Sequence, residues 1–271
     1  MSFSTILFVS ALQWAALALI MAGAFLVQQR TGNSGFIDAI WTFGLGFVGI
    51  ASSLAPVGSG DTSTRQLLVA LLILVWSARL GSHIMRRSLT RVDDPRYGAL
   101  IEGWGADARR ELLVLAEKQA IVTVPLALSI FLAAHNPVPL LRFQDGIAVA
   151  IVLVAIAGEG LADRQLRDFI ASPVKTGRVC DRGLWAWSRH PNYFFEWTFW
   201  LAFPLLAIDL GGGYAAGWFA LLAPACMYWL LVYVSGIPPL EEHMVKSYGD
   251  AYRRYQARTS AFFPLPPQAA Q

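Results

Sequence analysis

Residues 5–27 read TILFVSALQWAALALIMAGAFLV, a stretch without one charged side chain. An α-helix rises about 1.5 Å per residue, so a run of this length crosses the hydrocarbon core of a bilayer, which is about 30 Å thick. No positive residue precedes the run, whereas the n-region of a cleaved signal peptide is basic. We therefore expect residues 5–27 to be a transmembrane helix that is retained in the protein.

Six further apolar runs of similar length follow along the chain. They lie at residues 36–55, 66–85, 119–135, 146–162, 192–210 and 214–236. Charged residues make up 14% of the 271 residues, against about 25% in soluble domains. This composition excludes a soluble globule, a disordered chain, a nucleic-acid-binding domain and a disulfide-stapled module. The sequence predicts an all-α, polytopic membrane protein with seven transmembrane helices and short cytoplasmic helices, as a single integral-membrane domain.

The lysines and arginines are distributed asymmetrically between the two sides of this topology. Most of them fall in segments 86–118 and 163–191 and in the tail after residue 237, whereas only Arg65 and Arg142 fall in loops on the other side. Positively charged loops face the cytoplasm. We therefore expect the N-terminus outside, the C-terminus in the cytoplasm, and soluble ligands entering from the cytoplasmic face.

Several common kinds of site are missing from the sequence. Cys180 and Cys226, with four scattered histidines, give no metal-ligand spacing, so no metal is expected. Neither a G-x-G-x-x-G nor a G-x-x-x-x-G-K-[ST] motif is present. Any nucleotide must therefore be held by cytoplasmic loops and helix ends.

Some polar residues at the ends of the apolar runs need an explanation. Asp38 opens the second run, where an acid must be paired or line a cavity, or else cap the helix at the interface. His83 follows Arg79 by four residues, so the two share one face of the third helix. Glu159 and Asp163 are also four apart, and they require donors such as ribose hydroxyls unless they form a salt-bridged helix end.

A polar cluster precedes the sixth run. Pro191 suits the first turn of a helix, so Arg189 and His190 would stand at the positive end of the helix dipole. Such a position attracts an anion, above all a phosphate. Glu196 follows Asn192 by four residues and lies on the same helix face. The combination favours a binding site over an ordinary helix start.

The C-terminal tail carries a third cluster after the proline pair at 238–239. If one helix follows these prolines, Glu241, Tyr248, Tyr252 and Tyr255 form a single stripe on it. Aromatic stripes commonly serve as packing surface. Here the glutamate and the neighbouring cations favour a lid over an anionic ligand.

These motifs together resemble the membrane-embedded steroid 5α-reductase family, the 3-oxo-5α-steroid 4-dehydrogenases. The resemblance is carried by RHPNY at 189–193 with Glu196, by ADRQL at 162–166, and by a tail that runs from EE at 241–242 through YGD at 248–250 to Tyr252 and Tyr255. The chain is similar to a bacterial member, which implies the inner membrane. Sterol C14 and C7 reductases and isoprenylcysteine methyltransferases share part of the signature.

The resemblance implies that seven helices enclose NADPH, with residues 146–271 as the cofactor-binding half. The residues that match the family's cofactor site are Asp163, Arg178, Asn192, Tyr193 and Glu196. The remaining expected cofactor ligands follow from the clusters above and are Glu159, Arg189, His190, Glu241, Tyr248, Tyr252 and Tyr255.

The resemblance also implies a reaction, the reduction of the Δ4 double bond of a 3-oxo-Δ4-steroid or a similar enone lipid. Hydride from NADPH would reach C5 while a protonated acid stabilises the C3 enolate. Asp38 is the candidate acid where the family more often has glutamate. The family's catalytic tyrosine has no clear counterpart in the third run, so either His83 replaces it or Tyr97 folds back. The lipid substrate would enter from the bilayer between the helices of residues 1–145, and no nucleic acid or obligate protein partner is implied.

Two other functions remain open. The first is a membrane methyltransferase that uses S-adenosylmethionine on an isoprenoid or lipid; its cofactor has no phosphate and would not need the cations of 163–191. The second is a transporter with a buried carboxylate relay, which predicts helices broken near the middle of the membrane.

Overall fold

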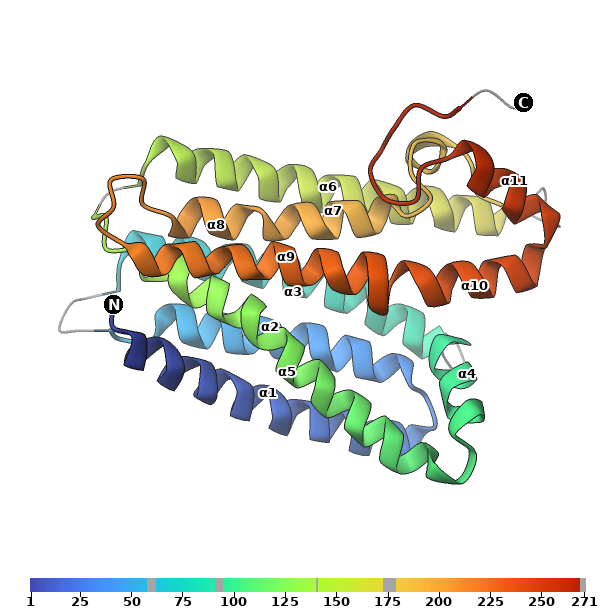
Figure 1. Cartoon of the computed structure of the whole chain (residues 1–271), viewed down its shortest axis with the longest axis horizontal. Coiled ribbons are helices and arrows are strands. Elements are labelled where there is room, and N and C mark those ends of the chain that lie inside the picture. The colour runs from blue at the N-terminus through green and yellow to red at the C-terminus, as the bar shows by residue number, and fades with distance from the viewer. Residues whose placement is uncertain (58–61, 91–94, 140, 173–178, 269–271) are drawn as a thin grey trace. The chain divides into compact units, whose positions relative to one another are not determined.

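The structure of the chain is a computed structural model that describes residues 1–57, 62–90, 95–139, 141–172 and 179–268. Over these ranges the regular structure is helical, without a strand (Figure 1). Six helical segments are long and apolar enough to cross a membrane: Phe3–Thr31, Gly35–Leu54, Thr64–Thr90, Leu100–Ala134, Phe143–Ala171 and Ala215–Tyr248. The prediction of an all-helical, polytopic membrane protein is therefore confirmed.

The sixth expected run, 192–210, does not form one long helix. It divides into α7 (Pro191–Trp200) and α8 (Ala202–Ala207). Pro204 lies in the first turn of α8 and has no N–H to donate to the carbonyl four residues earlier. The continuous helix therefore ends just before it, and the described chain has six long apolar helices instead of seven.

The chain forms two compact units. The first contains Met1–Ala148 and Phe203–Ala223, and the second contains Val149–Ala202 and Pro224–Gln271. The boundary that the sequence predicts between residues 145 and 146 lies close to the point where the chain passes from the first unit to the second, after Ala148. Residues 203–223, however, belong to the first unit again. Helix α6 (Phe143–Ala171) contributes to both units.

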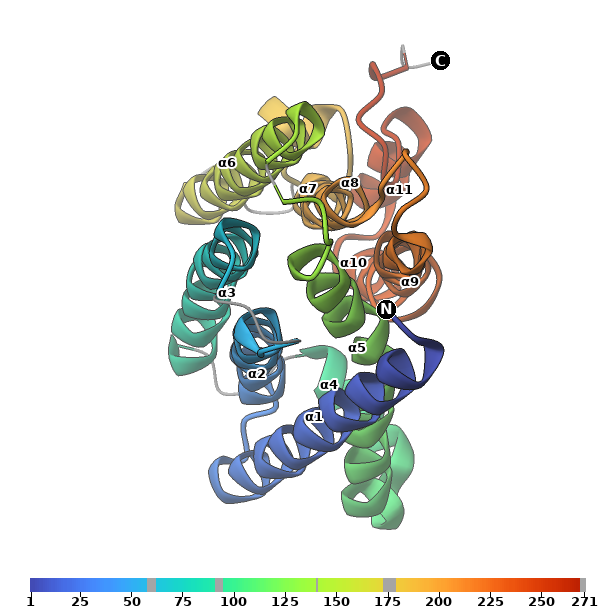
Figure 2. The same cartoon turned by 90° about the vertical axis from the view of Figure 1, so that its left-hand side faces the viewer.

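The first unit is built around α2 (Gly35–Leu54). This helix packs against α1 (Phe3–Thr31), α3 (Thr64–Thr90) and α5 (Ala108–Ala134), as Figure 2 shows. The short helix α4 (Pro95–Trp104) packs against α5. The first unit also includes a 3-10 helix over Ala215–Leu221, which contacts α5 as well.

Helices α2 and α3 approach closely because small residues line their contact. A Cβ atom on Gly46 would lie 2.1 Å from the Ser77 hydroxyl, and one on Gly81 would lie 2.6 Å from the Phe43 ring. Ser77 also donates a hydrogen bond of 3.2 Å to the Thr42 carbonyl. Helices in a bilayer gain little from apolar burial, so close packing and polar contacts of this kind hold them together.

A buried ion cluster closes one end of the first unit. Asp145 accepts hydrogen bonds from Arg65 and Arg142, both at 2.9 Å. Arg142 also donates to the carbonyls of Leu206 and Ile208, at 2.8 and 2.7 Å. These cations satisfy the free carbonyls at the C-terminal end of α8, where a positive charge is favourable. The sequence placed both arginines outside but did not predict this network.

The second unit contains the rest of α6, α7 and the C-terminal elements. A helix α9 (Leu222–Trp229) and a π-helical turn (Leu230–Val234) lead into α10 (Ile237–Tyr248). The two prolines that follow Ile237 stand at the start of α10, where their missing N–H groups have no intrahelical partner. The predicted helix of the tail is present, but it begins at Ile237, before the prolines, and the interruption lies at Ser235 and Gly236.

The expected single helical stripe in the tail is wrong. Helix α10 ends at Tyr248, Gly249 adopts a φ of +52°, and α11 (Asp250–Arg258) begins after it. A positive φ interrupts the helical repeat. Tyr248 is consequently exposed at the end of α10, whereas Tyr252 and Tyr255 are buried on α11.

Candidate functional site

A hydrogen-bonded chain in the first unit contains the predicted catalytic aspartate. The Tyr97 hydroxyl on α4 donates to Asp38 Oδ1 on α2 at 2.8 Å. Gln119 on α5 in turn donates from Nε2 to the Tyr97 hydroxyl oxygen at 3.1 Å. The three side chains therefore join three helices at one point.

Local sequence positions this chain. Asp38 lies in the first turn of α2, where the helix dipole favours a negative charge. One turn later, Trp41 donates from Nε1 to the Thr123 hydroxyl at 2.7 Å, and Thr123 donates to the Gln119 carbonyl at 2.6 Å. This second link joins α2 to α5 one turn later in each helix.

The two alternatives for the catalytic tyrosine differ in their geometry. Tyr97 folds back onto Asp38, and only 5% of the tyrosine is exposed. His83 lies on α3 with a partly buried side chain. Asp38 and Tyr97 thus form the acid–phenol pair that can polarise a carbonyl oxygen.

In the second unit, the carboxylate of Glu241 is held on three sides. Arg189 donates to it from Nε at 2.7 Å and from Nη2 at 3.1 Å. His190 Nε2 lies 3.0 Å from Glu241 Oε1, and Gln256 donates to Oε2 at 2.8 Å. Arg189 also donates to the carbonyls of Gln256 and Thr259. Four of the five N–H donors of a guanidinium are therefore in use.

Arg189, for which the sequence predicts a phosphate contact, binds a side chain of the protein itself in this structure. His190 is the N-cap residue of α7 and Pro191 its first residue, as predicted. The anion held by Arg189 and His190 is, however, the protein's own Glu241 carboxylate. Charge patterns predicted an anion at this place, but they did not distinguish a ligand from a side chain that follows 52 residues later.

Burial controls the protonation of the groups around Glu241. Desolvation lowers the pKa of His190 below 6.5, against the opposing effect of the Glu241 charge, so the imidazole is neutral near pH 7. Desolvation also raises the pKa of Tyr252, and the nearby Glu241 charge adds to the shift. Burial likewise raises the pKa of Tyr255, whose hydroxyl donates to the Trp185 carbonyl.

Tyr252 and Tyr255 lie in the interior of the second unit. With Val179 they form a small buried core, against which Met244 and Val245 pack. Tyr248, the third tyrosine of the predicted stripe, lies outside this core and is exposed.

Three other predicted cofactor ligands are buried acids of the second unit. Glu159 and Asp163 lie on α6, and Glu196 lies on α7, with exposures of 5 to 7%. Helices α6 and α7 meet directly, because a Cβ atom on Gly158 would lie 2.4 Å from the Phe195 ring. Glu159 and Glu196 each follow a residue of this contact.

The remaining predicted ligands lie at the start of α7 and in the loop before it. Tyr193 stacks on His190 with ring centroids 5.4 Å apart and an interplanar angle of 10°. Asn192 is half-buried beside it in sequence, and Glu196 Oε1 accepts a hydrogen bond of 2.9 Å from Trp200. Arg178 lies outside the residues that the structure describes.

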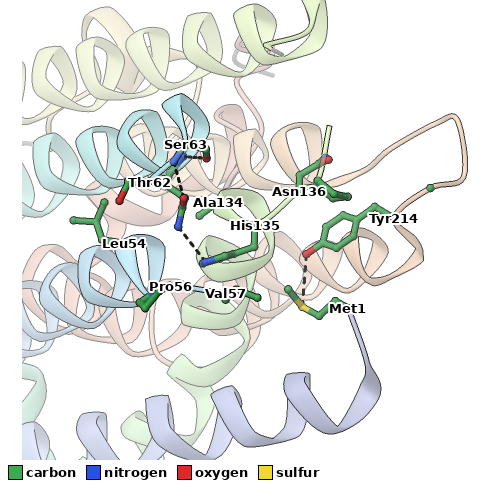
Figure 3. Close-up of a pocket in the computed structure, with 13 residues that line it drawn as sticks. Met1, Leu54, Pro56, Val57, Thr62, Ser63, Ala134, His135, Asn136 and Tyr214 are labelled. Atoms are coloured by element: carbon green, nitrogen blue, oxygen red, sulfur yellow. Dashed lines mark hydrogen bonds between the residues drawn. The ribbon is translucent and has the colours of Figure 1, made fainter. Parts of the chain in front are cut away.

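A separate pocket of about 400 Å³ lies in the first unit (Figure 3). Polar side chains that line it form hydrogen bonds to backbone carbonyls of the same unit. Gln66 donates to the carbonyls of Ser53 and Ala55, Asn136 donates to the carbonyls of Leu206 and Ala207, and Tyr214 donates to the Leu132 carbonyl. These bonds satisfy carbonyl groups of α2, α5 and α8 near the pocket, so the pocket is a weaker candidate than the Asp38–Tyr97 pair.

Sequence reasoning missed Gln119 and Gln256. Gln119 opens the apolar run 119–135, and its only signal is an isolated amide at a helix edge, one turn before Thr123. Gln256 is one polar residue among several on α11, and its contact with Glu241 depends on the bend at Gly249. Neither contact follows from spacing along the chain.

No curated protein and no solved structure matches the chain. Residues 24–259 match the family described as "Protein of unknown function (DUF1295)". Because this match covers most of the sequence, the chain belongs to the DUF1295 family.

Proposed function

We propose that the protein is a membrane-embedded, NADPH-dependent reductase of enone lipids, with 3-oxo-Δ4-steroids as the model substrates. The observation that carries this proposal is the hydrogen bond of 2.8 Å between the Tyr97 hydroxyl and the Asp38 carboxylate. A buried phenol beside a carboxyl group suits the polarisation of a substrate carbonyl. The DUF1295 family includes steroid 5α-reductase-like membrane proteins, which supports the same chemistry.

The acids of the second unit fit the polar parts of a dinucleotide. Glu159 and Asp163 would accept hydrogen bonds from ribose hydroxyls, and Asn192 with Glu196 would hold the carboxamide of the nicotinamide. Because Arg189 donates to Glu241, the phosphates of the cofactor would be bound by other cations of segment 163–191. When bound, NADPH would supply the hydride that reaches the β-carbon of the enone.

The role of Asp38 and Tyr97 is to stabilise the negative charge that develops on the substrate carbonyl oxygen. Tyr97 has a single hydroxyl hydrogen, which points to Asp38 in this structure. When Asp38 is protonated, it can donate to the Tyr97 oxygen, and Tyr97 can then donate its own hydrogen to the enolate oxygen. The saturated ketone forms when water or a nearby donor protonates the α-carbon and the enol oxygen returns its proton to Tyr97. Only 5% of Tyr97 is exposed, and the low dielectric of a buried position strengthens hydrogen bonds.

The proposal also completes the topology. Helices α7 and α8 together cover residues 191–207, about 25 Å of helix, and would form the seventh crossing. The N-terminus would then lie outside and the C-terminus in the cytoplasm of a bacterial inner membrane, with the lipid substrate entering from the bilayer.

A binding experiment tests this function. The protein, purified in detergent, is melted with NADPH, with S-adenosylmethionine and without ligand. A ligand that binds only the folded state raises the melting temperature. When its free concentration is 100 times its dissociation constant, it adds about 2.7 kcal/mol to the free energy of unfolding. We expect NADPH alone to stabilise the protein and the stabilised enzyme to reduce progesterone or testosterone. Stabilisation by S-adenosylmethionine alone would establish the methyltransferase alternative instead.

A further inference from the structure

Gln119 connects to the acid–phenol pair in an unusual way. Its Nε2 atom donates to the Tyr97 hydroxyl oxygen at 3.1 Å. Its Oε1 atom is buried and has no hydrogen-bond partner among the described residues. A buried carbonyl oxygen without a partner destabilises the folded protein. The amide is therefore held in an orientation that makes the hydrogen bond from Nε2 to Tyr97 but leaves Oε1 without one.

The orientation of the amide follows from the bonding capacity of the phenol. A tyrosine hydroxyl has one hydrogen and otherwise only acceptor positions. The hydrogen is directed at Asp38, so the group that faces Tyr97 from α5 must be a donor. Gln119 presents its N–H and turns its carbonyl oxygen away.

A donor at this place acts on the chemistry of Tyr97. When the hydroxyl gives up its hydrogen, negative charge develops on the phenolic oxygen. A hydrogen bond to a charged group is stronger than one to a neutral group, so the Gln119 N–H stabilises the product of proton donation more than the starting state. The same bond restricts the rotation of the hydroxyl and keeps it between Asp38 and the substrate position.

We propose that Gln119 is a positioning residue for Tyr97 in enone reduction, which makes the tyrosine a better proton donor without touching the substrate. This inference rests on the proposed reductase function. The contrasting role is a purely structural link between α4 and α5. Thr123, one turn away on α5, provides the matched control, since its bonds to Trp41 and to the Gln119 carbonyl are structural and do not reach Tyr97.

The experiment compares Gln119→Met, which keeps the length of the side chain but removes the donor, with Thr123→Val. The first measurement is independent of catalysis. Tyrosinate absorbance is followed against pH in each protein, and the contribution of Tyr97 is obtained by subtracting the same protein carrying Tyr97→Phe. We expect Gln119→Met to move the ionisation of Tyr97 about one pH unit higher and Thr123→Val to leave it unchanged.

The second measurement is kcat and KM with an enone substrate. Gln119→Met should lower kcat about tenfold with little change in KM for the enone, and Thr123→Val should lower only the melting temperature. If Gln119→Met does not fold, Gln119→Leu also removes the donor and should give the same direction of change.

The two measurements separate the two claims. A wild-type protein without reductase activity overturns the proposed function, and the ionisation of Tyr97 then still decides whether Gln119 acts on it. Equal shifts in Gln119→Met and Thr123→Val, or no shift in either, would show a structural link and overturn the inference.

Discussion

Arg189 and Glu241 form a two-point ion pair, in which Nε and Nη2 of the guanidinium lie 2.7 and 3.1 Å from the two carboxylate oxygens. The side chains are only 10 and 15% exposed. The pair joins the residue before the α7 cap to the first turns of α10. It therefore anchors the C-terminal helices of the second unit.

This ion pair predicts a loss of stability when Arg189 is replaced. Arg189→Met leaves the Glu241 carboxylate buried with fewer donors, and we expect the free energy of unfolding to fall by about 3 kcal/mol. The measurement is denaturation in detergent. Lys246→Met is the control, because the ion pair of Lys246 with Glu242 is exposed and should contribute nothing measurable. If Arg189→Met leaves the free energy of unfolding unchanged but weakens NADPH binding, Arg189 contacts a phosphate of the cofactor and does not anchor the helices.

The burial of His190 predicts a pH dependence of stability. Its pKa in the folded protein is lower than the ordinary 6.5, so the unfolded chain binds more protons as the pH falls below that value. The free energy of unfolding therefore decreases from neutral to acidic pH. His190→Gln should flatten this dependence in melts recorded at a series of pH values. A dependence that is equally steep in the variant would assign it to other groups.

The contact between α6 and α7 predicts contrasting effects of two glycines. Gly158→Ala places a methyl group against Phe195, where overpacking costs about 1–3 kcal/mol. Gly160→Ala meets nothing within 4 Å and should be neutral. We expect only Gly158→Ala to lower the melting temperature and the affinity for NADPH, since Glu159 and Glu196 adjoin the contact. The same loss in both variants would mean that helix packing is not the cause.

The buried ion cluster of the first unit predicts a structural role for Asp145. Asp145→Asn leaves Arg65 and Arg142 without their shared carboxylate, and we expect a loss of about 3 kcal/mol in the free energy of unfolding. Asp168→Asn, which removes an exposed partner of Arg164 at 3.9 Å, is the control. Comparable melting temperatures for the two variants would refute this role.

Hydropathy and charge predicted the helical membrane fold because both depend only on composition along the chain. They did not predict the interruptions of the helices. The break before α8 follows from Pro204, and the break after α10 follows from the positive φ of Gly249. Both residues were visible in the sequence. A helical stripe drawn through Gly249 assumes that the backbone continues without such a break.

The candidate sites were predictable in their residue types and less so in their pairings. Asp38 stood out as an acid at a helix start, but sequence alone left Tyr97 and His83 as equal partners, because spacing does not show whether a chain folds back after a helix. Tyr97 lies 59 residues from Asp38 in sequence. For the same reason the sequence did not show that Glu241 is the anion that Arg189 binds, because pairs far apart in sequence depend on how the chain packs.

The hydrogen bond between Tyr97 and Asp38 is most directly tested by NADPH oxidation with progesterone or testosterone in detergent. We compare wild type with Tyr97→Phe and Asp38→Asn, and we use Glu102→Gln, an exposed residue on the same short helix as Tyr97, as the control. Both site variants should lose about 100-fold in kcat, while Glu102→Gln and the affinity for NADPH stay unchanged. Full turnover in Tyr97→Phe and Asp38→Asn would remove this pair from the reaction and contradict the proposed mechanism.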